Sequence, residues 1–399
     1  MIDSIFIALS GMLGHQRGLN VISNNIANLN TPGFRGSAVD FADLFSGTAP
    51  NSPQNGAFAG QQNLGGGGLD STHTQLDLRA GTQQQTGRDL DLFLQGNGFF
   101  VVTEPDGAIR YTRDGAFKFN DGALVTSAQE LKVMTRNANG ELVAVELKDL
   151  QVNPPKATTE VTFTGDLSSD DTDHSIDSVD VFDKLGGKHT LSLKFTKSTD
   201  ATAGTLPGAT VSWKVSVVEG SEEIGTGTVD FVGGVVSSPL QLTLAFKNTE
   251  QADVAFNFSG VNGFSLGTTS TLAVQKQDGF ASGTIATETF DTNGVLKLTY
   301  SNGQMVDGPK LVLAEIRDDG GLKEIGNSLF AYQGSQTVTL REAGEDLQVL
   351  SKSLEQSNVE LTSQFSELIL MQRGYQASSQ VLSTANDMLQ ELFDIRGHR

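Results

Sequence analysis

The feature that most constrains this chain is a seven-residue repeat of mainly apolar side chains at its C-terminal end. The repeat places Leu361, Leu368, Tyr375, Leu382 and Leu389 at one position, and Gln364, Met371, Ser378, Ala385 and Leu392 three residues later. Two such positions in every seven form the stripe by which one helix packs lengthwise on another. The pattern predicts a helix from about residue 358 to about residue 395. We expect Ser357 or Asn358 as its N-cap, with Glu360 closing a capping box on Ser357.

The N-terminal end carries a second repeat of the same period. Its two sets of positions are Ile5, Met12, Leu19 and Ile26, and Ala8, His15, Ile22 and Leu29. Asn30-Thr31-Pro32-Gly33 then ends the predicted helix, because proline and glycine do not continue it cheaply. The C-terminal helix exceeds most globular helices in length, so it needs a partner. That partner is the N-terminal helix or the same segment of a neighbouring copy.

Proline and charge set these two ends apart from the middle of the chain. All nine prolines lie between Pro32 and Pro309, so neither predicted helix contains a residue that lacks a backbone donor. Residues 1–35 hold one acidic and two basic residues, and residues 351–399 hold six acidic and four basic ones. The whole chain has a net charge of −20, which therefore belongs to the middle. Nearly neutral ends suit surfaces that pack against other protein.

The middle of the chain has the period-two pattern of β-strands. Runs rich in Val, Phe, Thr and Leu predict strands within 90–102, 115–125, 189–195, 211–218, 229–236, 240–246, 253–258, 295–300 and 311–316. Asp-Gly or Asn-Gly pairs at residues 106, 114, 121, 293 and 302 predict hairpin turns. The fold class is therefore mainly β with long N- and C-terminal α-helices, in which discontinuous nested β domains accompany a terminal coiled-coil domain.

Breaks near Pro154-Pro155 and at residues 278–284 divide the middle. We expect a helical domain from residues 1–35 and 355–399, and a connector over 36–74. One discontinuous β domain is expected from 75–147 and 284–345, with an inserted outer β domain over 148–283. Within the connector, residues 46–68 have the low-complexity composition of a linker.

No pattern of residues indicates a catalytic, cofactor-binding or metal-binding site. The chain has no cysteine, which excludes disulfides, thiol catalysis and cysteine-ligated metals. Its histidines, at positions 15, 73, 174, 189 and 398, lack metal-ligand spacing. Residues 170–180 have acidic side chains at calcium-loop spacing, but Ile176 replaces the required glycine and Phe182 the bidentate glutamate. They predict a solvated acidic loop, and we expect no enzyme, no cofactor and no metal.

Smaller features have structural explanations. Gly96-Asn97-Gly98-Phe99 predicts a tight turn into a buried strand, and Trp213 alternates with Val211 and Val215 as a core residue does. The acidic balance disfavours nucleic-acid and anionic membrane surfaces. The apolar runs fall far short of the roughly 20 residues that a membrane helix needs. The start Met-Ile-Asp-Ser lacks the basic region of a Sec-type signal peptide.

Two classes of function remain. One is a structural subunit that polymerises through its helical ends, and the other is an acidic β-rich surface or binding protein. The long neutral repeats at both termini favour the first class. The plainer alternative is that the two helices pack on each other or on the β body.

Several motifs resemble those of the bacterial flagellar axial proteins, the rod and hook family. At the N-terminal end these are Val21-Ile22-Ser23-Asn24-Asn25-Ile26-Ala27-Asn28, Thr31-Pro32-Gly33-Phe34 and Phe41-Ala42-Asp43-Leu44-Phe45. The β body adds Thr86–Asp91, Gly96–Phe100 and Tyr111-Thr112-Arg113-Asp114-Gly115. Near the C-terminus lie Leu354-Glu355-Gln356-Ser357-Asn358-Val359 and Gln372-Arg373-Gly374-Tyr375-Gln376-Ala377. Ala128-Gln129-Glu130 lacks the glycine that the resemblance leads us to expect.

The resemblance implies a structural subunit of the hook, a flexible tube that acts as a universal joint between motor and filament. An insert of roughly 130 residues favours hook over rod, and a rod or other hook-like axial subunit is the second candidate. The terminal helices would line the inner tube of a helical homopolymer. Implied partners are the hook cap, the distal rod protein, the hook–filament junction protein and the flagellar type III export apparatus. The implied location is the exported hook. The motif residues that the resemblance singles out are Asn24, Asn25, Asn28, Pro32, Gly33, Phe34, Ser357, Asn358, Gln372, Arg373 and Tyr375. For the three asparagines it implies a role in fixing the helix end and subunit contacts, and the alternative is that they satisfy their own backbone at the helix end.

Overall fold

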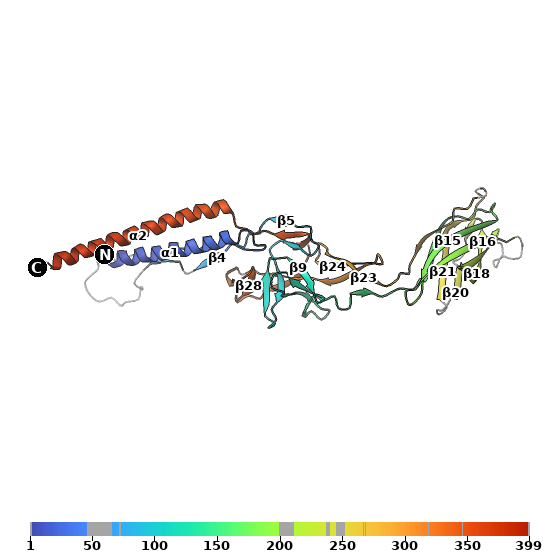
Figure 1. Ribbon diagram of the computed structural model, residues 1–399, viewed down its shortest axis with the longest axis horizontal. Helices are drawn as coiled ribbons and strands as arrows, with labels where there is room; N and C mark the ends of the chain where they lie inside the picture. Colours follow the sequence, from blue (N-terminus) through green and yellow to red (C-terminus); the bar gives the residue numbers. More distant parts are fainter. Residues whose placement is uncertain are drawn as a thin grey trace, which may run out of the picture. The chain divides into compact units, whose positions relative to one another are not determined.

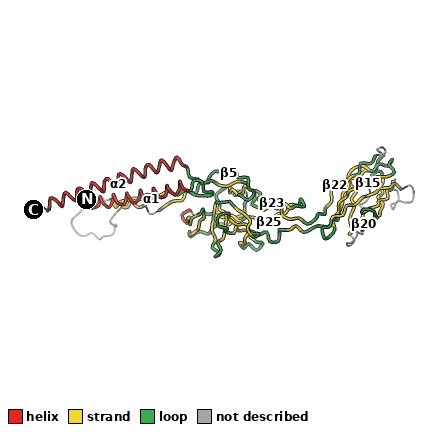
Figure 2. The backbone as a smooth tube through the Cα atoms, in the orientation of Figure 1, coloured by secondary structure: helices red, strands yellow, loops and turns green. Residues whose placement is uncertain are grey.

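The computed structural model describes residues 2–45, 66–71, 73–198, 211–236, 240–244, 252–265, 267, 269–317, 319–344 and 346–397. Most of the predicted linker stretch 46–68, together with His398, lies outside these residues. The chain divides into two compact units. Unit 1 comprises Met1–Lys148, Glu288–Lys297 and Asp307–Arg399, and unit 2 comprises Asp149–Thr287 and Leu298–Val306. Strands predominate between two terminal helices, which confirms the predicted fold class (Figure 2).

The two long helices belong to unit 1 and lie side by side (Figure 1). α1 spans Ile2–Ala27 and α2 spans Leu361–Gly397. They run antiparallel: Gly11 of α1 lies against Ser378 of α2, whereas Asn25, later in α1, contacts Gln364, earlier in α2. The partner of α2 within this chain is thus α1.

The start of α2 differs from the sequence-based expectation. The helix begins at Leu361, and its first described backbone bond from Gln364 reaches the carbonyl of Glu360. The predicted N-cap at Ser357 or Asn358 is therefore wrong. Asn358 instead bonds to two other segments of the chain, which takes its side chain away from the helix end.

The largest sheet of unit 1 has ten strands. Its main path is β27 (Leu322–Gly326), β28 (Leu329–Tyr332), β8 (Ile109–Thr112), β7 (Phe99–Thr103), β11 (Lys132–Arg136), β10 (Ala123–Thr126) and β9 (Phe117–Asn120). β12 (Leu142–Ala144) pairs with β11, β26 (Val312–Glu315) with β7, and β29 (Thr339–Glu342) with β26. The core on this sheet includes Val101, Val312 and Phe330. A short 3-10 helix, η1, spans Asp319–Gly321.

Unit 1 also contains four two-stranded pairs. They are β1 (Ser37–Val39) with β4 (Thr74–Leu76), β2 (Ala42–Phe45) with β3 (Gly66–Asp70), β5 (Gln83–Gln85) with β31 (Ser353–Glu355), and β6 (Leu92–Gln95) with β30 (Gln348–Ser351). Of these, β2–β3 lies beside the first half of α1. A four-stranded sheet has the order β13 (Val152–Asn153), β23 (Gly283–Phe290), β24 (Val295–Tyr300) and β25 (Met305–Lys310). The pairs β5–β31 and β6–β30 bring the segment before α2 next to residues 83–95, far away in sequence.

Unit 2 is built on a nine-stranded sheet. Its path is β15 (Asp173–Phe182), β16 (Lys188–Lys197), β17 (Val211–Glu219), β18 (Glu222–Val232), β19 (Val235–Val236), β21 (Ala252–Asn262), β14 (Glu160–Asp166) and β22 (Ala273–Gln277), with β20 (Leu240–Leu244) on β21. Trp213 is fully buried in its core together with Phe163, Phe195 and Phe256, which confirms the predicted core position. Along β16 and β17 the alternation of apolar and polar residues buries one face of the strand.

Two expectations for unit 2 are wrong. The acidic stretch 170–180 is mostly strand β15 and not a loop, because Val179 and Val181 alternate into the core while Asp173 and Asp177 face solvent. The predicted strand 229–236 is broken into β18 and β19 at Gly233-Gly234. Both glycines have positive φ angles, 63° and 82°, which form a turn.

One of the predicted hairpin turns is wrong, and one turn without glycine still has the left-handed backbone that glycine usually provides. Asp121-Gly122 joins β9 to β10 with φ angles of 49° and 79°, as a hairpin turn requires. Asp114-Gly115 is not a hairpin, because β8 and β9 do not pair, and Gly115 lies against Leu92 instead. Glu130 occupies the place where glycine was expected and adopts the left-handed φ of 58°.

Candidate functional site

The paired terminal helices form the first part of the candidate site. Along α1, Ile5, Met12, Leu19 and Ile26 are half-buried, while Ala8 and Ile22 are fully buried. Along α2, Leu368, Leu382 and Leu389 are half-buried and Ala385 is buried. Leu361 and Tyr375 are exposed at 41% and 37%, so these two repeat positions lie off the interface. The neighbouring Gly374 faces α1 in place of Tyr375.

Glycines allow the helices to approach closely. A Cβ atom on Gly11 would lie 3.0 Å from Ser378 Oγ, and one on Gly18 would lie 2.8 Å from Met371 Sδ. A Cβ atom on Gly374 would lie 2.4 Å from the His15 ring. The apolar repeat did not identify these glycines as interface residues, because glycine has no apolar side chain to count. The seven-residue spacing of Gly11 and Gly18 was the signal that could have identified them.

The three asparagines of the N-terminal motif have two different roles. Asn25 is buried, donates a 2.9 Å hydrogen bond to Gln364 Oε1, and exchanges hydrogen bonds with the backbone of Ser37. Asn28 donates to the backbone and side-chain oxygens of Asn24, one turn earlier. Asn25 therefore joins segments, whereas Asn24 and Asn28 bond locally at the helix end.

After α1 the chain makes a sharp turn at Gly33. This turn lies at the base of the helical pair, the end at which α1 ends and α2 begins. Gly33 has a φ of 67°, and its amide donates to the backbone carbonyl of Glu355. A Cβ atom there would lie 2.4 Å from the backbone nitrogen of Asp114, so only glycine fits. Phe34 is buried, and the carbonyl of Pro32 accepts a hydrogen bond from Ser328.

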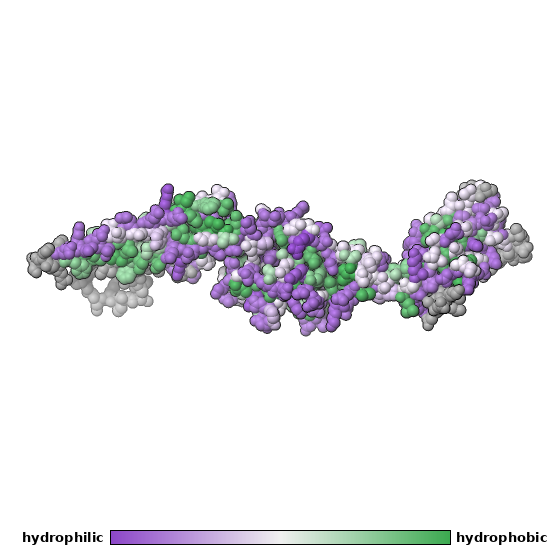
Figure 3. Space-filling view, in the orientation of Figure 1, coloured by the Kyte–Doolittle hydropathy of each residue, from purple (hydrophilic) through white to green (hydrophobic). Residues whose placement is uncertain are grey.

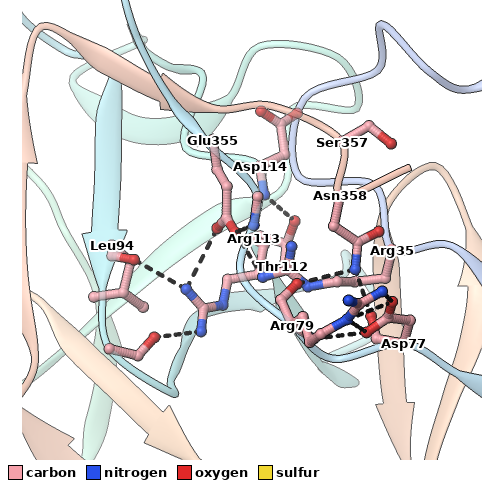
Figure 4. A network of polar contacts seen from close by, with 12 residues as sticks. Arg35, Asp77, Arg79, Leu94, Thr112, Arg113, Asp114, Glu355, Ser357 and Asn358 are labelled. Atoms are coloured by element: carbon pink, nitrogen blue, oxygen red, sulfur yellow. Dashed lines mark hydrogen bonds and ion pairs between the residues drawn. The ribbon is translucent and has the colours of Figure 1, made fainter. Parts of the chain in front are cut away.

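A buried charge network lies at this base and forms the second part of the site (Figure 4). The carboxylate of Glu355 accepts from Arg35 Nη2 at 2.7 Å, from the Gly81 amide at 2.7 Å and from Arg113 Nη1 at 3.3 Å. Arg113 also donates to the carbonyls of Leu94 and Gly96. The side chains of Arg35, Arg113 and Glu355 are at most 2% exposed. Water therefore contributes little to holding these charges.

Burial and neighbouring charges set the electrostatics of the network. Burial lowers the pKa of Arg113 to about 10, which Glu355 opposes and Arg35 reinforces. Burial also raises the pKa of Asp114. Glu355 is thus the ion-pair partner of two buried cations, and its removal would take that pairing from both.

Asn358 closes the network on the side of α2. Its Oδ1 accepts from the Gly36 amide at 2.8 Å, and its Nδ2 donates to the carbonyls of Asp77 and Arg79 at 2.8 and 2.9 Å. Ser357 accepts a hydrogen bond from the amide of Val359. Gln372 and Arg373 are exposed on α2, away from the network. The three motifs at residues 33–35, 111–115 and 354–358 therefore meet at one place, which their separation in sequence did not reveal.

The outer surface of the helical pair carries many large apolar side chains (Figure 3). Those that are more than 36% exposed are Phe6, Ile7, Leu9, Leu13, Leu361, Phe365, Ile369, Leu370, Tyr375, Val381, Met388, Leu392 and Phe393. We call these residues the outer apolar face. An open groove of about 460 Å³ between the helices is lined by Ile7, Gly11, Leu69, Ala377 and Val381, among others.

Within the described part of the chain, no group of three or more metal-ligating side chains comes together. None of the helices described there is long and apolar enough to cross a membrane.

Comparisons with known proteins agree with this description. Residues 5–35 match the family "Flagella basal body rod protein", residues 93–166 match "Flagellar hook protein FlgE/F/G D1 domain", and residues 350–395 match "Flagellar basal body rod FlgEFG protein C-terminal". The flagellar hook protein FlgE of Treponema pallidum is 28% identical, and that of Borreliella burgdorferi 29%, each over 99% of this chain and 100% of its own length. The flagellar basal-body rod protein FlgG of Bacillus subtilis is 24% identical over 99% of this chain and all of its own length. A crystal structure of Helicobacter pylori flagellar hook protein FlgE2 gives a TM-score of 0.47 at 14% identity, over 68% of this chain and all of that one.

Proposed function

This chain belongs to the bacterial flagellar rod and hook protein family and is a structural subunit of the hook, and we propose that it polymerises through the outer apolar face of its helical pair. The hook relatives are more similar to it than the rod relative, at 28–29% against 24% identity. The acidic surface-protein alternative is therefore not favoured. In this proposal the subunit acts by assembling into a tube that transmits torque.

The observation that carries the proposal is the distribution of large apolar side chains on α1 and α2. The interface between the helices uses small residues such as Gly11, Gly18 and Gly374, and it buries only part of the repeat. Phe365 and Phe393 remain 50% and 68% exposed. Large apolar side chains left exposed in this number on two paired helices mark a protein-interaction site. Copies of the same chain would cover it in a helical homopolymer.

We propose that the charge network anchors the helical pair to the β strands of unit 1. Glu355 binds Arg35 after α1 and Arg113 after β8, and Asn358 ties the segment before α2 to residues 36–79. Hydrogen bonds to charged groups hold a fixed geometry better than apolar contacts do. Such an anchor would pass torque between the inner helices and the β domains.

The remaining proposals rest on family membership. They are contacts with the hook cap, the distal rod protein, the hook–filament junction protein and the flagellar type III export apparatus. The division into a helical domain, a discontinuous β domain and an outer domain over 148–283 is also proposed. The separation of the two units near Lys148 supports the start of the outer domain only, because unit 1 contains both the helices and most of the inner β domain.

The test is electron microscopy of the concentrated chain. We expect tubes from the wild-type protein and none from Phe365→Ser combined with Phe393→Ser, since the double variant loses apolar surface without losing a helix-pair contact. Gln390→Ser, an exposed change on the same helix, serves as the control and should still form tubes. Tubes from the double variant would contradict the proposal.

A further inference from the structure

We propose that α1 and α2 carry a register lock, four matched pairs of residues that allow the helices to align in only one way. The pairs are Gly11 with Ser378, His15 with Gly374, Gly18 with Met371, and Asn25 with Gln364. The steps along α1 are four, three and seven residues, and the same steps are taken backwards along α2. This inference rests on the proposed assembly function, because it concerns the helical pair that the polymer would use.

The first three pairs match a small residue on one helix with a larger one on the other. His15 fills the space that Gly374 leaves, and Met371 fills the space beside Gly18. The roles alternate, since the larger residue belongs to α1 in one pair and to α2 in the other. A shift by one turn would set His15 against Met371 or Ser378. Helix cores tolerate such overpacking poorly, and the unfilled glycine positions would become cavities.

The fourth pair adds a polar restriction. Asn25 is only 2% exposed, and its amide group donates to Gln364 Oε1 at 2.9 Å. His15 contributes another polar contact, with Nδ1 at 3.5 Å from Met371 Sδ. A shifted alignment would leave the buried amide of Asn25 opposite a different side chain. Asn25 would keep its hydrogen bonds to the Ser37 backbone but lose the one to Gln364, and a single buried polar residue can fix the register of a coiled coil.

The lock resolves an ambiguity that the heptad repeat leaves open. If one helix slides along the other by seven residues, the apolar positions of the two stripes still face each other. Such a slide would bring Asn25 to Met371 or to residue 357, before the start of α2, so the matched pairs exclude it. The observed alignment also sets the free end of α2. Continued along both helices, the spacing of the four pairs places Ile2 level with Asp387, and Figure 1 shows the end of α2 lying beyond the start of α1.

This end continues the interface stripe of α2 past the described start of α1. Met388, Leu392 and Phe393 are exposed at 50%, 46% and 68%. Because the interface continues into it, a second copy of this chain is the occupant that the end fits. The lock thus determines how much of α2 each subunit offers to its neighbour.

The absence of cysteine allows a direct test by pairs of introduced cysteines. A Cβ atom on Gly11 lies 3.8 Å from Ser378 Cβ, the usual separation across a disulfide. We expect Gly11→Cys with Ser378→Cys to oxidise rapidly to a monomer with an internal cross-link on a non-reducing gel. The matched control, Gly11→Cys with Ala385→Cys, reports a slide of one heptad and should not cross-link.

An exchange of the matched side chains then tests the steric lock. In the cross-linking pair, Gly374→His should slow internal disulfide formation about tenfold or more through overpacking. His15→Gly added to it exchanges the two residues without changing composition and should restore the rate. Equal cross-linking of the two cysteine pairs, or an exchange that fails to restore the rate, would overturn the lock.

The experiment separates this inference from the proposed function. Cross-linking is measured on dilute monomer and needs no polymer. A lock that holds in a chain that never forms tubes would count against the assembly proposal alone. Tubes formed by a chain whose off-register pair cross-links equally well would count against the lock alone.

Discussion

Arg35 Nη2 lies 2.7 Å from Glu355 Oε1, and neither side chain is more than 1% exposed. The contact joins the segment that follows α1 to the strand that precedes α2. Glu355 also accepts from Arg113, so the same carboxylate holds the β domain of unit 1 to both helices. Loss of this one group should therefore loosen the base of the helical pair.

Glu355→Gln should destabilise unit 1 by about 3–5 kcal/mol, because it removes the ion-pair partner of two buried guanidinium groups. Denaturation followed by far-UV circular dichroism measures the loss. Trp213, the single tryptophan, lies in unit 2 and reports separately on that unit by fluorescence. Glu342→Gln removes the exposed partner of Lys310 and should cost only about 0–1 kcal/mol. Equal effects of the two changes would show that the network does not stabilise the base.

Gly33→Ala should destabilise unit 1 through two separate effects. The left-handed backbone costs an alanine about 1–2 kcal/mol, and its Cβ would meet the backbone nitrogen of Asp114 at 2.4 Å. Gly87→Ala is the matched control, since Gly87 has a φ of 76° with nothing within 4 Å. The difference in unfolding free energy between the two variants isolates the contact. No difference would argue against a tight fit at Gly33.

Leu368→Asp or Leu382→Asp should abolish polymer without unfolding the β body. Each puts a charge into the half-buried face between α1 and α2, where it has no water to solvate it fully. Helical circular dichroism should fall while Trp213 fluorescence stays unchanged. Ser383→Asp, on the exposed side of α2, should keep both helix signal and assembly. Unchanged assembly in the leucine variants would refute the packing role of this face.

Acid should weaken unit 2 through Asp278. Burial acts to raise the pKa of this carboxyl, but hydrogen bonds from the Thr159 hydroxyl and the Glu160 and Thr159 amides, with Lys156, outweigh it and lower the pKa to about 2. The depressed pKa stabilises the fold above the ordinary value of 3.8, and this stability disappears as the pH falls toward about 2. Trp213 fluorescence in an acid titration should show Asp278→Asn losing this dependence, and Asp177→Asn keeping it.

Local patterns in the sequence were enough to predict the helices, most strands and several turns. The heptad positions of α2 and the period-two runs around Trp213 depend on neighbours three, four or two residues apart, which the chain order already specifies. The acidic strand β15 escaped the prediction because its charged side chains, on the solvent side, obscured the alternation of Val179 and Val181. The N-cap at Ser357 or Asn358 failed for a related reason, since a side chain can serve a distant segment as readily as the nearest amide.

The sequence by itself determined that two amphipathic helices flank an acidic β body, and its motifs indicated the family. Only the tertiary structure decided which residues of those helices meet, and which charges share Glu355. Gly374 receives His15, and Glu355 receives Arg35 and Arg113, across hundreds of residues. Periodicity reports which face of a helix is apolar, but it does not report the partner or the register. Those depend on the shapes and hydrogen bonds of groups that come together only when the chain has folded.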